Sequence, residues 1–77
     1  MPRAYVLINV EAGAENEVLK DLKEIQAVKE AHTIYGVYDI IARVETGNME
    51  ELKNVVSWKI RRLDNVRSTI TTICVEL

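Results

Sequence analysis

The sequence predicts a small α+β domain, in which a four-stranded antiparallel sheet carries two helices on one face. Two observations lead to this fold class. The spacing of apolar residues alternates between strand and helix in the order β-α-β-β-α-β, and the two halves of the chain repeat one pattern. Residues 1–77, with 48% hydrophobic and 29% charged side chains, fit one globular domain.

The first half of the chain predicts a strand, a helix and a second strand. Residues 4–10 are rich in β-branched and aromatic side chains, which favours a strand. The turn Glu11–Gly13 ends it, and apolar residues then recur at helical spacing over residues 14–25. The side chains of this helical stripe are Val18, Leu19, Leu22 and Ile25. Residues 28–35 are expected to form the second strand, although they contain a Lys-Glu pair of low β propensity.

The second half repeats the order strand, helix, strand. A tight hairpin at Tyr35–Val37 leads into a strand predicted over residues 37–45. Asn48 is a suitable N-cap, and a glutamate three residues later completes a capping-box pair. The second helix is expected to run to about Leu63, and the last strand, dominated by Thr, Ile and Val, covers residues 66–75. The apolar face of this helix consists of Leu52, Val55, Val56, Ile60 and Leu63.

An internal echo supports this order. When the chain is shifted by 34 residues, so that Val6 falls on Ile40, strand, turn and helix positions coincide. The other matched pairs are Ile8 with Ala42, Val10 with Val44, Glu11 with Glu45, Gly13 with Gly47, Glu17 with Glu51, Val18 with Leu52 and Leu22 with Val56. Any two strand-helix units share some resemblance, but the common register favours a true repeat. Two such halves side by side make a ferredoxin-like sandwich.

Composition narrows the class of partner. The formal net charge is −2 and the pI is near 5.3, which argues against direct nucleic-acid binding, because phosphate contacts need clustered Lys and Arg. One cysteine and one histidine supply neither an internal disulfide nor a structural zinc site, and we expect no cofactor. The start resembles no signal peptide, and no apolar run approaches the ~20 residues of a membrane helix. We therefore expect a cytoplasmic protein without a membrane partner.

The outward face of the predicted sheet is apolar. If Val6 and Ile8 face the helices, then Leu7 faces away from them, and Ile41 does the same on the third strand. A chain this short often needs a disulfide, a metal or oligomerisation for stability, and only oligomerisation is open to it. We therefore predict a homodimer that packs sheet against sheet. The residues predicted at this interface are Leu7, Ile41 and Ile73.

Two segments are candidates for a binding site, whereas no set of residues resembles a catalytic site. With one histidine, the chain has no Cys-His-Asn or Ser-His-Asp set, and its three glycines are isolated at turns. The hairpin Tyr35–Asp39 combines aromatics, a permissive glycine and an acid, which fits a ligand site and ordinary turn chemistry equally well. The hydroxyl run Ser68–Thr72, taken alone, is better explained by the strand propensity of threonine.

Four further features have simpler explanations. His32 and Cys74 are better explained as surface or packing residues than as a ligand and a reactive thiol. Trp58 lies off the apolar stripe of its helix and fits either packing at the helix edge or an oligomer contact. The only basic cluster is better explained as a solvated helix end than as a nucleic-acid site. It consists of Arg61, Arg62 and Arg67.

At the two candidate segments the sequence resembles a known family. Residues 35–44 are similar to the glycine-x-aromatic-aspartate hairpin and following strand of the Lrp/AsnC transcription regulators. Residues 66–73 are similar to their closing valine-x-x-threonine-x-threonine strand, and the opening strand with Gly13 also fits. The resemblance covers nearly the whole chain, but it is to the effector-binding half only, which is called the RAM domain (regulation of amino acid metabolism).

The resemblance implies a domain that dimerises through its sheet, assembles into rings of dimers, and binds an amino acid or similar small effector between dimers. The implied ligand-binding residues are Tyr35, Gly36, Val37, Tyr38 and Asp39 of the hairpin, and Thr69 and Thr71 of the last strand. Asp39 or backbone carbonyls would hold the ammonium group. Amides near Gly36 and the threonine hydroxyls would hold the carboxylate, while Val37 and Tyr38 would shape the side-chain pocket.

Family members usually carry an N-terminal helix-turn-helix, for which residues 1–77 leave no room. We therefore expect one stand-alone RAM-like domain with no helix-turn-helix domain and no direct DNA binding. Such a domain could modulate transcription through a full-length Lrp/AsnC regulator. Three rivals remain: a pure assembly module without ligand, a small dimeric ferredoxin-like enzyme, and an ACT-like domain. The apolar inner face disfavours the enzyme, and the hairpin and threonine motifs favour RAM over ACT.

Overall fold

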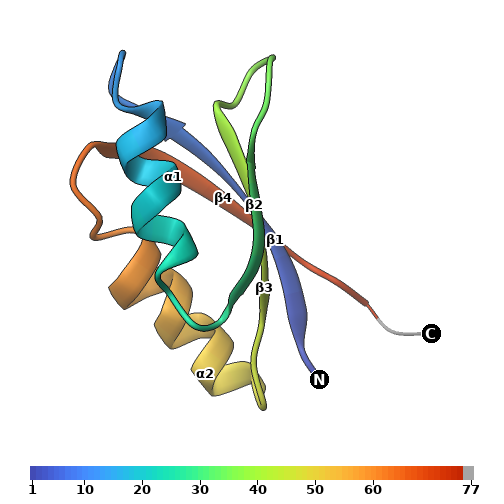
Figure 1. The fold of residues 1–77 in the computed structure, drawn as a ribbon. Coiled ribbons are helices and arrows are strands. Elements are labelled where there is room, and N and C mark those ends of the chain that lie inside the picture. The colour runs from blue at the N-terminus through green and yellow to red at the C-terminus, as the bar shows by residue number, and fades with distance from the viewer. Residues whose placement is uncertain (76–77) are drawn as a thin grey trace.

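The computed structural model describes residues 1–75, and these contain the predicted elements in the predicted order (Figure 1). The strands are β1 (Arg3–Val10), β2 (Val28–Thr33), β3 (Ile40–Glu45) and β4 (Val66–Ile73). The helices are α1 (Glu15–Lys23) and α2 (Met49–Asn54), and α2 continues directly as a π-helix, η1 (Val55–Ile60). No helix in the described part of the chain is long and apolar enough to cross a membrane.

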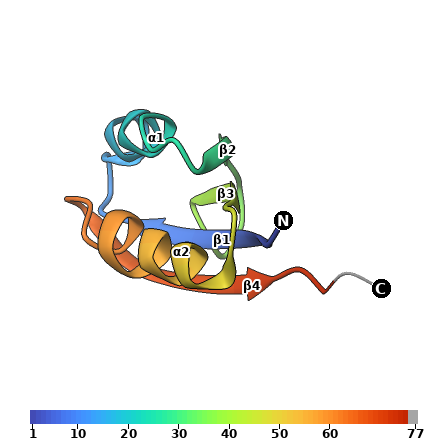
Figure 2. The ribbon, with the colours of Figure 1, turned by 90° about the horizontal axis from the view of Figure 1, so that it is seen from below.

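The four strands form one antiparallel sheet in the order β2-β3-β1-β4. Both helical segments lie on the same face of the sheet, α1 towards β2 and α2 towards β1 and β4 (Figure 2). This arrangement confirms the ferredoxin-like fold that the apolar spacing predicted. It leaves β2 and β4 as edge strands, and no helix of residues 1–75 lies on the second face of the sheet.

The core lies between the sheet and the helices. Alternate residues of the two central strands face inward, because successive side chains of a strand point to opposite faces. The buried residues on β1 are Ala4, Val6, Ile8 and Val10, and those on β3 are Ile40, Ala42 and Val44. The helices contribute Val18, Leu22, Leu52, Val55, Val56 and Ile60. The predicted inward face is therefore confirmed, and full burial of each larger side chain contributes roughly 1.5–3 kcal/mol to the free energy of unfolding.

The second helix begins as predicted but changes its winding. The side chain of Asn48 accepts a hydrogen bond from the Glu51 amide (2.8 Å), and the Glu51 carboxylate accepts one from Gly47 (3.3 Å). From Val55 onward the turns widen, and the Arg61 amide donates to the Val56 carbonyl five residues back (3.0 Å). The expectation of one helix to Leu63 is therefore wrong: the segment ends at Ile60 as a π-helix, which keeps its valines and isoleucine buried.

The hairpin between β2 and β3 is longer than predicted. β2 ends at Thr33 and β3 begins at Ile40, so a six-residue loop replaces the expected tight turn. A hydrogen bond from the Ile34 amide to the Asp39 carbonyl (2.9 Å) closes this loop. The reason is Asp39, whose amide donates to the Ile8 carbonyl of β1 (3.0 Å). This bond holds Asp39 against β1.

The side of the sheet without helices is here called the open face. Its apolar part is a row that crosses three strands, because Leu7 pairs with Ile41 of β3 and with Ile70 of β4. Ile73 pairs with Ala4, whose side chain is buried under the helices, so Ile73 lies on the helix side. The expectation that Ile73 shares a face with Leu7 and Ile41 is therefore wrong. Ile70 takes this position, because side chains alternate along β4.

Candidate functional site

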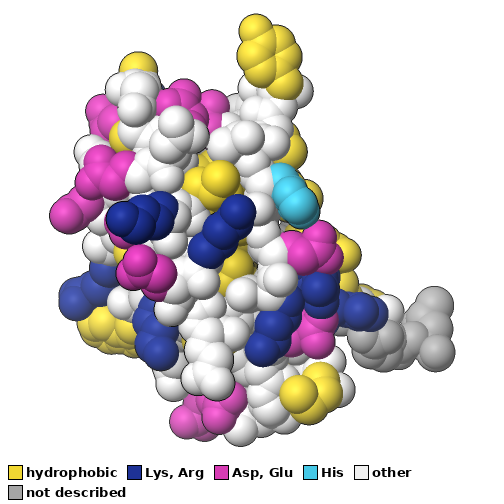
Figure 3. Space-filling model, in the orientation of Figure 1, with side chains coloured by type: hydrophobic (Ala, Val, Ile, Leu, Met, Phe, Trp, Pro, Cys, Tyr) yellow, Lys and Arg dark blue, Asp and Glu magenta, His cyan; other side chains and the backbone are white. Residues whose placement is uncertain are grey.

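The hairpin loop forms one side of a surface hollow. The loop stands at one corner of the molecule, where a hydrophobic side chain projects beyond the rest of the surface (Figure 3). Tyr35 is fully exposed, and Val37 is 84% exposed. The hollow has a volume of about 710 Å³, and its only charged lining residues are the acids Glu15 and Asp39. The remaining lining residues are Asn16, Thr33, Ile34, Tyr35 and Gly36.

Asp39 has a structural bond as well as a place in this hollow. Its Oδ2 atom accepts a hydrogen bond from the Val10 amide (2.9 Å), at the end of β1 where the pairing with β4 becomes irregular. This use of a carboxylate to satisfy a backbone amide is charge-assisted and therefore stronger than a neutral hydrogen bond. Any ligand ammonium at Asp39 shares the carboxylate with the backbone of β1.

Thr69 and Thr71 lie elsewhere, in a trough between β4 and the second helix. This trough consists of two adjoining hollows of about 380 and 260 Å³, which share Arg61 and Thr69. We call it the basic trough. Its polar lining residues are Lys53, Ser57, Arg61, Arg67, Ser68, Thr69 and Thr71, and its apolar ones are Leu52, Val56, Val66 and Ile73. Ile73, expected at a dimer interface, is thus part of the trough instead.

The structure keeps the two parts of the predicted site in separate hollows, with Arg67 between them. A small hollow of about 240 Å³ contains both Asp39 and Arg67, and Arg67 also lines the basic trough. Arg67 reaches this position at an irregularity in the sheet: Asn9 pairs with Ser68 and Val10 with Val66, which leaves Arg67 as an extra residue. None of these three hollows contains a hairpin residue together with Thr69 or Thr71.

The cations of the basic trough were missed in the sequence, where the arginines were explained as a solvated helix end. The signal that could have found them is their spacing. Lys53, Ser57 and Arg61 are four residues apart, which puts them on one side of a helix. The threonines of β4 are two apart, which puts them on one side of a strand. The sequence could not show that these two sides face each other.

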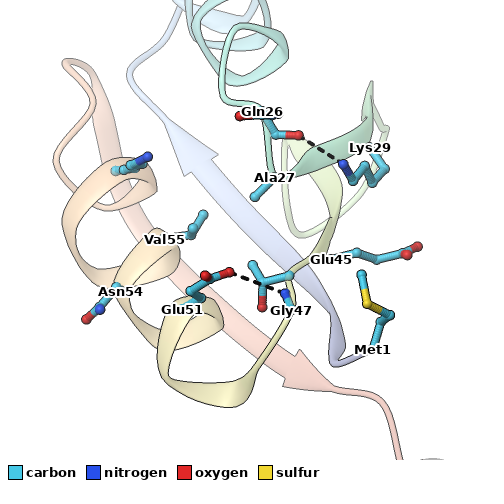
Figure 4. Close-up of a pocket in the computed structure, with 11 residues that line it drawn as sticks. Met1, Gln26, Ala27, Lys29, Glu45, Gly47, Glu51, Asn54 and Val55 are labelled. Carbon is cyan, nitrogen blue, oxygen red and sulfur yellow. Dashed lines mark hydrogen bonds between the residues drawn. The ribbon is translucent and has the colours of Figure 1, made fainter.

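A further cavity of about 530 Å³ lies at the other end of the helical layer, between α2, the start of β2 and the turn after β3 (Figure 4). It contains no predicted site residue. Charges of both signs line it, including Lys29, Glu45 and Glu51. Several of its polar groups are already engaged: Lys29 donates to the Gln26 carbonyl (3.2 Å), and Glu51 accepts from Gly47. Because charges of both signs line this cavity, it favours neither an anionic nor a cationic ligand.

A charged network lies on the open face beside the apolar row. The Glu30 carboxylate is bonded to His32 (3.0 Å) and Arg43 (2.9 Å), and Arg43 is also paired with Glu45. The bonds from His32 and then Arg43 lower the pKa of the Glu30 carboxyl group. The bond to Glu30 raises the pKa of the Arg43 guanidinium. His32, unassigned in the sequence, is therefore part of a surface ion network.

Comparison with known proteins gives the class of this domain. A family model described as the Lrp/AsnC ligand binding domain matches residues 3–77. The HTH-type transcriptional regulator FL11 of Pyrococcus furiosus is 31% identical over 74 residues, which are 96% of this chain and 48% of that protein. The fold and these matches define a ligand-binding domain of the kind found in transcription regulators.

Solved structures agree with this class. The crystal structure of FFRP-DM1 is 37% identical, with a TM-score of 0.94, and the match covers 97% of this chain and 100% of that one. E. coli AsnC is 26% identical, with a TM-score of 0.91, over 99% of this chain and 52% of that one. The chain therefore belongs to the Lrp/AsnC ligand binding domain family, as the hairpin and threonine motifs indicated. It spans about half the length of the curated relatives it matches.

Proposed function

We propose that the chain is a non-enzymatic effector-binding and assembly module, which binds an amino acid at a contact between chains. Support comes first from the family, because the relative FL11 that matches this chain is a transcriptional regulator. It comes next from the positions of the two reactive side-chain types. His32 bonds to Glu30 on the open face, and Cys74 follows the end of β4, so neither lines the hairpin hollow or the basic trough.

The observation that carries the proposal is the division of the candidate site into two halves. The hairpin half has acidic groups and exposed Tyr35 and Val37, whereas the β4 half has cations and hydroxyls. An amino acid carries one positive and one negative group, so it complements both halves at once. We infer that a second chain completes the site, with Asp39 binding the ammonium group and Thr69 and Thr71 the carboxylate.

The remaining hairpin residues have supporting roles in this proposal. The amides near Gly36 bind the ligand carboxylate together with the threonines, and Val37 and Tyr38 contact the ligand side chain. A contact between unlike surfaces, repeated around a symmetry axis, closes into a ring. A ligand that binds only at this contact stabilises the ring by mass action.

The dimer from which such rings are built is proposed to form through the open face. Leu7, Ile41 and Ile70 supply an apolar row on which no helix of residues 1–75 lies, and a second sheet is a common cover for such a face. The same surfaces fit the matching half of a longer Lrp/AsnC regulator, so mixed assembly is a second part of the proposal. Co-purification of a tagged chain with such a regulator, made in the same cells, tests that part.

The first test is the light-scattering mass of the chain after size exclusion, with and without a pool of the twenty amino acids. We expect a dimer or ring in the absence of the pool, and a larger or thermally more stable ring in its presence. Single amino acids then identify the effector. An assembly whose mass and melting temperature ignore every amino acid would contradict ligand binding and favour a pure assembly module.

A further inference from the structure

The basic trough carries charge of one sign. Its charged lining residues are Lys53, Arg61 and Arg67, and no Asp or Glu lines either of its two hollows. The whole chain has a net charge of −2, so this concentration of cations does not follow from composition. Clefts lined by one sign of charge concentrate ligands of the other sign.

Most of these cations have no partner of their own. Neither Lys53 nor Arg61 forms an ion pair with any residue in the described part of the chain. Arg67 lies beside Glu11, with 3.4 Å between its Nε and the glutamate Oε2, and both side chains are more than half exposed. An exposed pair of this kind contributes little and leaves the terminal nitrogens of Arg67 free for other acceptors. The trough therefore has unused positive charge.

The cations are divided between two places rather than gathered at one. Within the trough, Lys53 lines the larger hollow and Arg67 the smaller one, while Arg61 and Thr69 line both. The larger hollow also has an apolar side formed by Leu52, Val56 and Ile73. The trough therefore offers two anion positions with Arg61 between them, and an apolar side for methylene groups beside the Lys53 position.

From this geometry we propose that the basic trough binds ligands with two carboxylates, and that the effector is accordingly an acidic amino acid such as glutamate or aspartate. The second half of this statement rests on the proposed function above. Arginine presents paired donors that match a carboxylate, and the hydroxyls of Ser57 and Thr71 supply further donors. A phosphate group shares the negative charge, but it is compact and matches convergent cations better than divided ones.

The test is calorimetric titration of the whole chain with L-glutamate, L-glutamine, L-leucine, glutarate and inorganic phosphate. Glutamine has nearly the same shape as glutamate without the second charge, so we expect it to bind at least about tenfold more weakly. Glutarate has both carboxylates without the ammonium group, and we expect it to bind. Equal affinity for glutamate and glutamine or leucine would overturn the proposal, and so would phosphate binding more tightly than glutarate.

Two substitutions in neighbouring residues locate the site. Arg61→Gln removes the cation shared by the two hollows, and we expect glutamate affinity to fall by about tenfold or more. Arg62→Gln is the matched control, because Arg62 stacks on Trp58, 4.3 Å from the ring centroid, and lines neither hollow. Equal effects of the two substitutions would reduce the proposal to general electrostatic attraction and overturn it. Lys53→Gln should also weaken glutamate binding. This variant tests the site even if Arg61→Gln does not fold.

The outcomes separate this proposal from the proposed function. If glutamate and glutarate bind at Arg61 but no amino acid changes the assembly, the trough binds dicarboxylates and effector-driven assembly is wrong. If leucine or another neutral amino acid drives assembly while glutamate does not bind, the module senses an effector and the dicarboxylate proposal is wrong. If no ligand binds in either experiment, both are wrong.

Discussion

Asp39 attaches the hairpin to the central strand through both its backbone and its side chain. Its amide bonds to the Ile8 carbonyl, and its carboxylate accepts from the Val10 amide. A residue with this structural task would be required whether or not a ligand binds. Asp39 therefore has a structural role that does not depend on ligand binding.

Two substitutions at this residue separate its two tasks. Asp39→Ala leaves the amide of the buried residue Val10 without its partner, and we expect a loss of roughly 1–2 kcal/mol in the free energy of unfolding. Asp39→Asn retains an acceptor oxygen but has no charge, so it should unfold near the parent temperature yet bind amino acids more weakly. Denaturant unfolding and calorimetry measure the two effects. An Asp39→Asn variant with the parent's affinity would remove Asp39 from the proposed site.

At the scale of single elements, the paired strands β2 and β3 carry the charged network of the open face. The pKa of Glu30 is lowered in the folded chain by its bonds to His32 and Arg43. A carboxyl group with a lowered pKa contributes stability that is complete above its ordinary value, near 4.5, and that disappears as the pH falls through the lowered value. The network therefore stabilises the hairpin strands at neutral pH and is lost in acid.

We predict that Glu30→Gln lowers the melting temperature at pH 7, and that the difference from the parent shrinks as the pH falls below about 4. The direct measurement is an NMR titration of the Glu30 carboxyl, which should have a midpoint below the ordinary value and move up in a His32→Ala variant. Glu24→Gln is the control, since the Glu24 carboxylate has no hydrogen bond or ion pair among residues 1–75. A pH-independent effect of Glu30→Gln would contradict the network.

The elements show which parts of the fold the sequence can predict. The periods of the apolar residues identified all four strands and both helical regions, because burial requires that spacing in any packing. The π-helix was not predictable, since it depends on how Val55, Val56 and Ile60 fit against the finished sheet. The hairpin length depends on a bond from Asp39 to β1, a strand remote in sequence.

The candidate site was less predictable for the same reason. The motifs selected Thr69 and Thr71, but their neighbours Lys53 and Arg61 come from the helix across the trough. Only the three-dimensional packing puts the two groups opposite each other. Both faces of β4 carry apolar side chains, so its sequence did not show whether Ile70 or Ile73 faces outward. The pairing of β4 with β1 decides this.

At the scale of the whole molecule, this assignment gives a matched test of the dimer. Ile70→Glu puts a charge into the apolar row of the open face, and we expect it to dissociate the dimer, because burying an unpaired charge is costly. Ile73→Glu introduces the same change three residues along, on the helix side, and should leave the dimer mass unchanged. Light scattering at micromolar concentration measures both. A dimer that survives Ile70→Glu, or is lost only in Ile73→Glu, would contradict the open-face interface.

The two faces of the molecule thus have separate tasks in the proposed assembly. The open face joins two chains through apolar contact, and the hairpin and trough serve the contact at which ligand binds. Because the tasks use different surfaces, variants of the trough should leave the dimer intact, and variants of the open face should leave dicarboxylate binding intact. This separation allows each proposal to fail on its own.

The single tryptophan makes these events observable without any label. Trp58 is 60% exposed and lies under the guanidinium of Arg62. An indole in this position emits at long wavelength, and its emission moves to shorter wavelength when a neighbouring molecule removes the water around it. Fluorescence of the unmodified chain therefore reports any chain-chain contact that covers this side chain, at concentrations too low for scattering.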